Sequence, residues 1–218
     1  MKKPALGLIF LCFASFCFAQ TDEHEEKLRQ QADSLYQQAQ YHFQQQDSIA
    51  LFGSLSDALE IYHFLQDTNS MANVTNDFGY YYYFFGDFEK SIPYYQQALV
   101  IDEAAGDTIA VIGRHYNISG AYSKLGQFVP AMEHLMQGLE LAKKIKRAKS
   151  LAMINNSLGG IFRNMEQYDP AAYHYHQALS SARQIQDSLR ASYTLNNLGI
   201  LHQELHNYDS AHYYYRLG

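Results

Sequence analysis

The stretch Leu158-Gly159-Gly160-Ile161-Phe162 has a counterpart further along the chain, Leu198-Gly199-Ile200-Leu201-His202. The same register holds twice more towards the N-terminus, where Ile118-Ser119 and Phe78-Gly79 stand at the matching positions. An apolar residue followed by a small one allows two helices to approach closely. The four pairs are spaced 40 residues apart. A fixed period of 40 residues indicates a stack of equivalent units, each burying its apolar face against its neighbours.

Further columns of similar residues keep this register, and each meets a packing or capping need. A polar turn residue precedes an aromatic one in Asp87-Phe88, Gln127-Phe128, Gln167-Tyr168 and Asn207-Tyr208. Small residues recur at Ser91, Ala131, Ala171 and Ala211. Asp67, Asp107 and Asp187, each followed by Ser or Thr, predict helix N-termini between units, and Arg147 interrupts that column.

Two stretches, Asn197-Leu198-Gly199-Ile200-Leu201-His202 and Tyr168-Asp169-Pro170-Ala171-Ala172-Tyr173-His174-Tyr175, resemble the tetratricopeptide repeat family. The resemblance covers about residues 30–218 and implies an all-α fold, a right-handed superhelical solenoid of antiparallel helix pairs. The commonest period in the family is about 34 residues, so the 40-residue unit implies longer helices, as in its long-period subgroup. We expect N-terminal helices and a degenerate first repeat at 20–69. The repeats proper are then expected at 70–109, 110–149, 150–189 and, incomplete, 190–218.

The N-terminus has the composition of a signal peptide. Two lysines at the second and third positions precede an apolar segment at 4–18, and the small residues Cys17 and Ala19 fit a cleavage site. We therefore predict that residues 1–19 are removed and that the mature protein is exported, to the periplasm or the extracellular space. A retained membrane anchor and lipidation at Cys17 are the alternatives. The bulky Phe16 before the cysteine makes lipidation the less favoured of these outcomes.

The composition of the mature chain excludes several classes of function. Both cysteines lie in the segment to be removed, so no thiol is left for a disulfide, a zinc site or a nucleophile. Loss of the two lysines changes the net charge from -6 to -8, a poor match for nucleic acid or anionic lipid. No glycine-rich phosphate loop, nucleophile elbow or paired-carboxylate motif is present. We expect a protein that is not an enzyme, has no cofactor and has no membrane span after processing.

His202 and His206 have the i, i+4 spacing of a metal-binding pair, but packing accounts for them better. In the zincin motif a glutamate directly follows the first histidine, whereas here Glu204 stands two positions after it. His202 also occupies the column of Tyr82 and Phe162, which is an aromatic packing column. We therefore predict no metal site at this pair.

The family resemblance implies a concave wall lined by the first helix of each pair, and with it a groove for a ligand. It places on this wall the candidate peptide-binding residues Asn76, Tyr80, Tyr83, Tyr116, Lys124, Asn156, Arg163, Asn164, Tyr193, Asn196 and Gln203. Amide side chains both donate to and accept from a peptide backbone, and tyrosines are good anchors. The alternatives are that the asparagines merely tolerate partly exposed helical positions and that the tyrosines pack against a neighbouring unit.

Five cations, Lys143, Lys144, Lys146, Arg147 and Lys149, lie at the predicted end of a second helix. There they complement the helix dipole and stay solvated, and the alternative is a docking patch for an acidic partner.

The sequence thus predicts an exported scaffold that binds a protein or peptide. The alternative is the extracytoplasmic sensory input domain of a bacterial signalling regulator whose output domain lies outside this chain. Gly218 falls within a repeat, which favours the second reading or a shortened relative of a longer protein. It also predicts that the C-terminal repeat frays from about Tyr208 or pairs end to end with a second copy.

Overall fold

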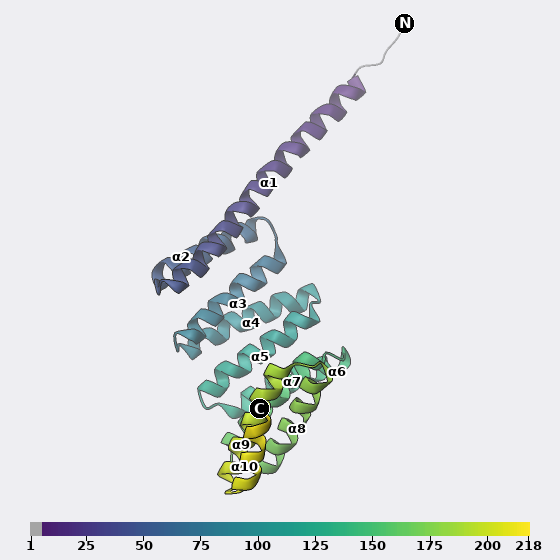
Figure 1. The fold of residues 1–218 in the computed structure, drawn as a ribbon. Helices are drawn as coiled ribbons and strands as arrows, with labels where there is room; N and C mark the ends of the chain where they lie inside the picture. The colour runs from purple at the N-terminus through teal and green to yellow at the C-terminus, as the bar shows by residue number, and fades with distance from the viewer. Residues whose placement is uncertain (1–5) are drawn as a thin grey trace. The chain divides into compact units, whose positions relative to one another are not determined.

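A computed structural model describes the backbone of residues 6–218 and the side chains from residue 23 onward, and within this range the chain is all-α (Figure 1). Its helices are α1 (Leu6–Gln44), α2 (Ser48–Phe64), α3 (Thr68–Phe84), α4 (Phe88–Ala105), α5 (Thr108–Lys124), α6 (Phe128–Lys144), α7 (Ala148–Asn164), α8 (Tyr168–Gln184), α9 (Ser188–Glu204) and α10 (Tyr208–Leu217). The first five residues and all side chains of the predicted signal peptide lie outside the described residues. No helix of the described part is both long enough and apolar enough to cross a bilayer.

The helices follow a regular spacing along the chain. From α2 onward the helices begin at even intervals, so that α3, α5, α7 and α9, which begin at Thr68, Thr108, Ala148 and Ser188, each start one full period after the last. The expected repeat boundaries at 70, 110, 150 and 190 lie just inside these four helices. The structure divides into two compact units, residues up to 78 and residues 79–218, and the division falls within α3.

The first unit is built on the packing of α1 against α2. Ala32 and Ala39 of α1 and Leu51 and Leu55 of α2 are fully buried. Near the end of α2, the Tyr62 hydroxyl donates a hydrogen bond to an Asp33 carboxylate oxygen at 2.6 Å. These contacts give the unit a small apolar core closed by a polar bond.

In the second unit each helix from α4 to α10 packs against the next one in the chain. In addition α5 contacts α7, and α7 contacts α9, so these three first helices lie along one wall. One core cluster consists of Ile112, Ala131, Leu135, Leu139, Ala142, Ile154, Leu158 and Ile161, drawn from α5, α6 and α7. The wall and its core are what position the candidate site.

Glycines in the small-residue column make room for tyrosine rings from the second helix of the same pair. A Cβ atom on Gly159 would lie 2.6 Å from the ring of Tyr175, closer than real side chains approach. The same arrangement recurs in the pairs Gly79–Tyr95 and Gly199–Tyr215. The remaining unit has Ser119 and Leu135 at these two positions. A larger residue on the first helix is therefore matched by a smaller partner on the second.

A second recurring contact is a stacked aromatic pair between the two helices of each pair. The rings are Tyr82–Tyr94, Tyr122–His134, Phe162–His174 and His202–Tyr214, with centroids 5.2–5.9 Å apart and planes within 16°. His202 thus takes the packing role that its column predicts. A histidine replaces a phenyl or phenol ring here because a neutral imidazole is also a flat stacking surface.

Helix starts and turns follow the same register. As predicted, the Asp107 carboxylate accepts hydrogen bonds from the Ile109 and Ala110 N–H groups, and Asp187 accepts one from the Arg190 N–H. Arg147 precedes α7 without a capping side-chain bond. Each turn between helices contains one residue with positive φ, a feature that the column pattern did not reveal. These residues are Gln46, Gln66, Gly86, Gly106, Gly126, Lys146, Glu166, Gln186 and His206.

The helix α10 is the least covered of the second unit. Ala211 is buried, whereas Tyr208, Tyr213 and Leu217 are exposed. The fraying or self-association expected of the C-terminal repeat stays a prediction.

Candidate functional site

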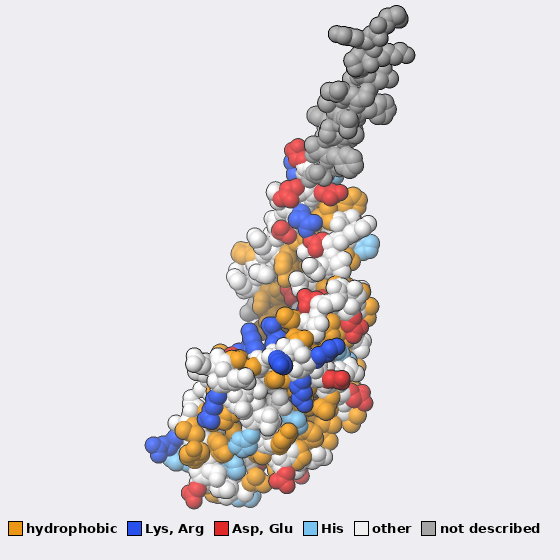
Figure 2. All heavy atoms as spheres, turned by 90° about the vertical axis from the view of Figure 1, so that its right-hand side faces the viewer, with side chains coloured by type: hydrophobic (Ala, Val, Ile, Leu, Met, Phe, Trp, Pro, Cys, Tyr) orange, Lys and Arg blue, Asp and Glu red, His pale blue; other side chains and the backbone are white. Residues whose placement is uncertain are grey.

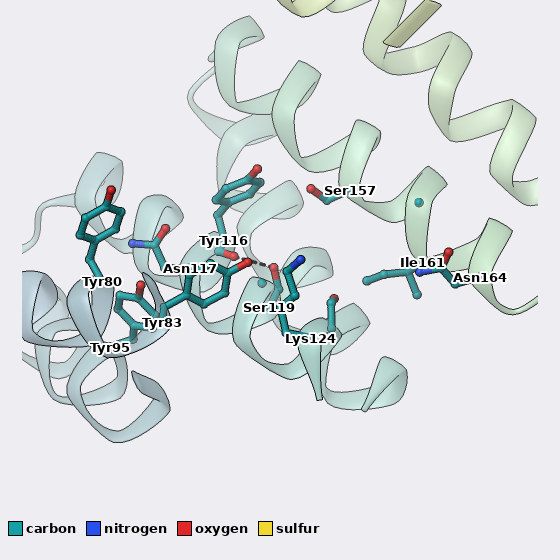
Figure 3. Close-up of a pocket in the computed structure, with 13 residues that line it drawn as sticks. Tyr80, Tyr83, Tyr95, Tyr116, Asn117, Ser119, Lys124, Ser157, Ile161 and Asn164 are labelled. Carbon is teal, nitrogen blue, oxygen red and sulfur yellow. Dashed lines mark hydrogen bonds between the residues drawn. The ribbon is translucent and has the colours of Figure 1, made fainter. Parts of the chain in front are cut away.

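A pocket of the second unit lies between the C-terminal end of α3, the middle of α4, the helix α5 and the C-terminal half of α7. We call it the tyrosine pocket; its volume is about 400 Å³. Its lining consists of Tyr80, Tyr83, Tyr95, Tyr116, Asn117, Ser119, Gly120, Ser123, Lys124, Ser157, Gly160, Ile161 and Asn164. Figure 3 shows tyrosines of α3 and α4 on one side and Ser157, Ile161 and Asn164 of α7 on the other.

The tyrosine pocket is open because two successive units have glycine where the others have a large side chain. Gly120 and Gly160 occupy the positions that hold Tyr80 and Ile200 in the flanking units. A Cβ on Gly120 would be 3.8 Å from the Tyr83 ring, and one on Gly160 would be 3.7 Å from the Tyr175 hydroxyl. These are ordinary contact distances, so a larger side chain at either glycine would occupy the pocket rather than disrupt the helix packing.

The tyrosines of this pocket differ in exposure. Tyr80 is 45% exposed, whereas Tyr83 is half-buried and Tyr95 is 2% exposed. Burial raises the pKa of the Tyr83 phenol, and the nearby Tyr116 adds to the effect. The Ser119 hydroxyl donates to the Tyr116 backbone oxygen at 2.6 Å, which fixes the floor of the pocket (Figure 3). The pocket thus presents phenol hydroxyl groups, which can donate and accept hydrogen bonds, beside Gly120, Gly160 and Ile161.

Two smaller pockets continue along the wall, and Tyr116 lines all three. The asparagine pocket, about 210 Å³, is lined by Tyr116, Ala152, Met153, Asn156, Leu189, Arg190, Tyr193 and Thr194. The aliphatic pocket, about 160 Å³, is lined by Ile109, Ile112, Gly113, Tyr116, Arg147, Lys149, Ser150, Met153 and Ile154. Because all three pockets share Tyr116, they lie next to one another along α5, α7 and α9.

The structure brings seven of the eleven predicted binding residues to these pockets. Tyr80, Tyr83, Tyr116, Lys124 and Asn164 line the tyrosine pocket, and Asn156 and Tyr193 join Tyr116 at the asparagine pocket. Asn76 belongs to the first unit, and Arg163, Asn196 and Gln203 line none of the three.

Several of the predicted residues interact with other side chains of the protein, among them Arg163, Gln203 and Asn156. The Arg163 guanidinium lies 3.7 Å from a Glu204 carboxylate oxygen, so its charge is partly balanced within the protein. Gln203 accepts a hydrogen bond from the Tyr215 hydroxyl at 3.0 Å. Asn156 accepts one from the Asn197 side-chain amide at 2.9 Å, which links α7 to α9 at the edge of the asparagine pocket.

Sequence reasoning missed Tyr95 and the glycine floor. It assigned the wall to first helices alone, but Tyr95 reaches the tyrosine pocket from the second helix α4. The signal that could have found it is the pairing of a tyrosine with a glycine at a fixed spacing before it, here Gly79. The consecutive small residues Ser119-Gly120 and Gly159-Gly160 could likewise have marked the floor.

The described residues contain no group of three or more His, Asp or Glu side chains arranged to hold a metal ion. The surface offers phenol, amide and hydroxyl groups beside apolar walls, which suits recognition of a polypeptide segment by hydrogen bonding and ring packing.

Comparison with known proteins agrees with this architecture. The tetratricopeptide repeat family matches residues 75–104, 113–145 and 150–217, more than half of the chain. The chain therefore belongs to the tetratricopeptide repeat family. Comparison with curated proteins gave no match.

Solved structures share the fold at low sequence identity. Aspartyl phosphate phosphatase F from Bacillus subtilis is 16% identical with a TM-score of 0.81, over 98% of this chain and 55% of that one. A Rap protein complexed with competence and sporulation factor is 15% identical with a TM-score of 0.67, over 86% and 62% of the two chains. A kinesin light chain with nearly identical TPR-like repeats from Podosopora anserina is 15% identical with a TM-score of 0.68, over 87% and 93%.

Proposed function

We propose that this chain is an exported scaffold that holds an extended segment of a protein or peptide along α5, α7 and α9. The observation that carries the proposal is the tyrosine pocket, in which four tyrosines, two asparagines and three serines surround a gap left by two glycines. Tyrosine supplies a large contact area at low entropic cost, and amides satisfy a ligand backbone. The Rap structure solved with competence and sporulation factor supports the use of this fold for capturing another molecule.

The pocket can be tested by filling it. Random peptides displayed on phage are selected on the full chain, and the affinity of a selected peptide is measured for Gly120→Phe. The new ring would occupy the tyrosine pocket, so we expect a loss of about 2 kcal/mol or more, as for a binding hot spot. The matched control is Gly53→Phe, the same change at an exposed helical glycine of the first unit. Equal affinities of the two variants would remove the pocket from the binding site.

The amide contribution is tested at Asn156, which lines the asparagine pocket, and at the exposed Asn196. Replacing both with Ala should weaken a selected peptide by about 1 kcal/mol per side chain, the usual net value of a hydrogen bond. Because amide and aromatic contacts dominate, this binding should change little with salt. An unchanged affinity, with helix content intact by circular dichroism, would place the ligand elsewhere.

Export is tested by the intact mass of the protein recovered from its native host. We expect a mature chain that begins at Gln20, because nothing in the repeat register uses residues 1–19. A mass that includes Met1 would contradict export with cleavage.

A further inference from the structure

The turn between α6 and α7 carries a concentration of positive charge, of which only Arg147 and Lys149 line one of the three pockets. We call it the basic corner: Lys143, Lys144, Lys146, Arg147 and Lys149. None of the five forms a salt bridge within the described part of the chain. The lysines are exposed and Arg147 is half-buried, and no Asp or Glu stands between Glu140 and Glu166.

The fold does not require this charge, because equivalent turns form without it. In the preceding unit residues 103–109 carry Glu103 and Asp107 and no cation. In the following unit residues 183–189 carry one cation, Arg183, and one anion, Asp187. All three turns place the same position in the left-handed region, so their backbones correspond. Cations at a helix C-terminus complement its dipole, but the two equivalent turns form with one cation or none, so the dipole does not require five.

The aliphatic pocket opens beside the basic corner. Ile109, Ile112, Met153 and Ile154 supply apolar walls, and Arg147 and Lys149 stand among the lining residues. A cavity of about 150 Å³ holds a benzene molecule, so the 160 Å³ here is sufficient for a Leu or Ile side chain. An apolar hole with a cationic border selects for an apolar side chain that has carboxylates beside it.

Charge across the wall is consistent with such a ligand. No Asp or Glu lines the tyrosine, asparagine or aliphatic pocket, although acidic residues outnumber basic ones by 22 to 16 in the chain. Figure 2 shows Lys and Arg side chains gathered in the middle of one face, with Asp and Glu side chains at the border of the group. The acidic remainder of the chain would repel an anionic ligand from other faces and direct it to this one.

We propose that the basic corner and the aliphatic pocket dock an acidic segment of a protein ligand, with an aliphatic side chain in the pocket and flanking carboxylates on the lysines and arginine. This rests on the proposed function, since it names the chemistry of one stretch of the bound polypeptide. It adds a salt-sensitive contact to a groove whose other lining residues are mostly uncharged.

The test uses three labelled synthetic peptides and fluorescence anisotropy with the full chain. The sequences are Glu-Asp-Leu-Asp-Glu, its amide counterpart Gln-Asn-Leu-Asn-Gln, and Glu-Asp-Ser-Asp-Glu. We expect the first to bind more tightly than either of the others. Lys146→Glu combined with Lys149→Glu should weaken it by about tenfold, since two exposed ion pairs become repulsive. Glutamate is tolerated in the left-handed turn position, as Glu166 shows.

The matched control is Arg183→Glu combined with Arg216→Glu, the same charge change at exposed residues that are not part of the basic corner. Gly113→Leu fills the aliphatic pocket, since a Cβ there meets nothing within 4 Å, and should remove the advantage of leucine over serine. Equal binding of acidic and amide peptides, or equal losses in both charge variants, would overturn the proposal. Binding of phosphatidylglycerol vesicles at the corner without peptide binding would also overturn it, in favour of a lipid headgroup.

The two proposals fail separately. If Gly120→Phe leaves phage-selected peptides bound while the acidic peptide still depends on Lys146 and Lys149, the groove function is wrong and the acidic docking site stands. If the selected peptides require the tyrosine pocket but the binding of the acidic peptide does not depend on the basic corner, the groove function stands and the acidic docking site is wrong.

Discussion

The Gly159 and Tyr175 contact permits a quantitative test of how the repeats pack. A Cβ at Gly159 would lie 2.6, 2.7 and 2.9 Å from three atoms of the Tyr175 ring, which is fully buried. Gly159→Ser should therefore lower the free energy of unfolding by about 1–3 kcal/mol, the usual cost of overpacking. Gly160→Ser is the matched control on the same helix, because its Cβ finds its nearest neighbour at 3.7 Å.

The second arm of the test removes the ring. Tyr175→Leu loses buried area but also removes a hydroxyl that has no hydrogen-bond partner among the described residues, so we expect a net cost of about 1–2 kcal/mol. Combining it with Gly159→Ser recreates the Ser119 and Leu135 pair that another unit already uses. The double variant should then be more stable than the sum of the single effects predicts, by about 1 kcal/mol or more.

The assay is urea unfolding followed by circular dichroism on the four proteins of the cycle. Tyr175→Phe is an additional control, because it keeps the ring and deletes only the unpaired hydroxyl, and it should be neutral or stabilising. If the two single changes in the free energy of unfolding add up to that of the double variant within about 0.5 kcal/mol, the glycine and the tyrosine ring are not energetically coupled, and the reasoning is refuted.

Three further perturbations follow from buried polar groups and turns. Burial, and secondarily His134, lowers the pKa of His115 to about 4, so the unfolded chain binds the proton first and stability falls as pH drops from about 6.5 to 4. The free energy of unfolding, measured by urea denaturation, should fall by about 3 kcal/mol over this pH range. A urea midpoint that does not change between about pH 6.5 and 4 would contradict this prediction. Asp102→Asn removes the negative charge beside the buried Arg114, whose Nε donates to the carboxylate at 2.7 Å, and should lower the free energy of unfolding by about 3–5 kcal/mol, measured by thermal unfolding. Glu166 has a φ of 60°, so Glu166→Gly should relieve up to about 1 kcal/mol of backbone strain and raise the melting temperature slightly. A lower melting temperature for this variant would show that the turn is unstrained.

The sequence by itself determined the kind of fold and the positions within each unit. Helix starts followed from Asp107 and Asp187, because a carboxylate before a helix satisfies free N–H groups wherever the rest of the chain lies. The role of His202 followed from its column, since equivalent positions in a stacked repeat meet equivalent neighbours. Such features depend on local chemistry and on the repeat period, and both are visible in the linear sequence.

Only the tertiary structure decided which candidate residues meet. Tyr116 and Asn156 share a pocket, whereas Arg163 from the same predicted wall turns to Glu204. Tyr95 enters the tyrosine pocket from a second helix, and the gap exists because Gly120 and Gly160 are adjacent across two units. The repeat period states where a residue lies in its own unit, but the space between units depends on the volumes of side chains from both, and that is a property of their packing in three dimensions.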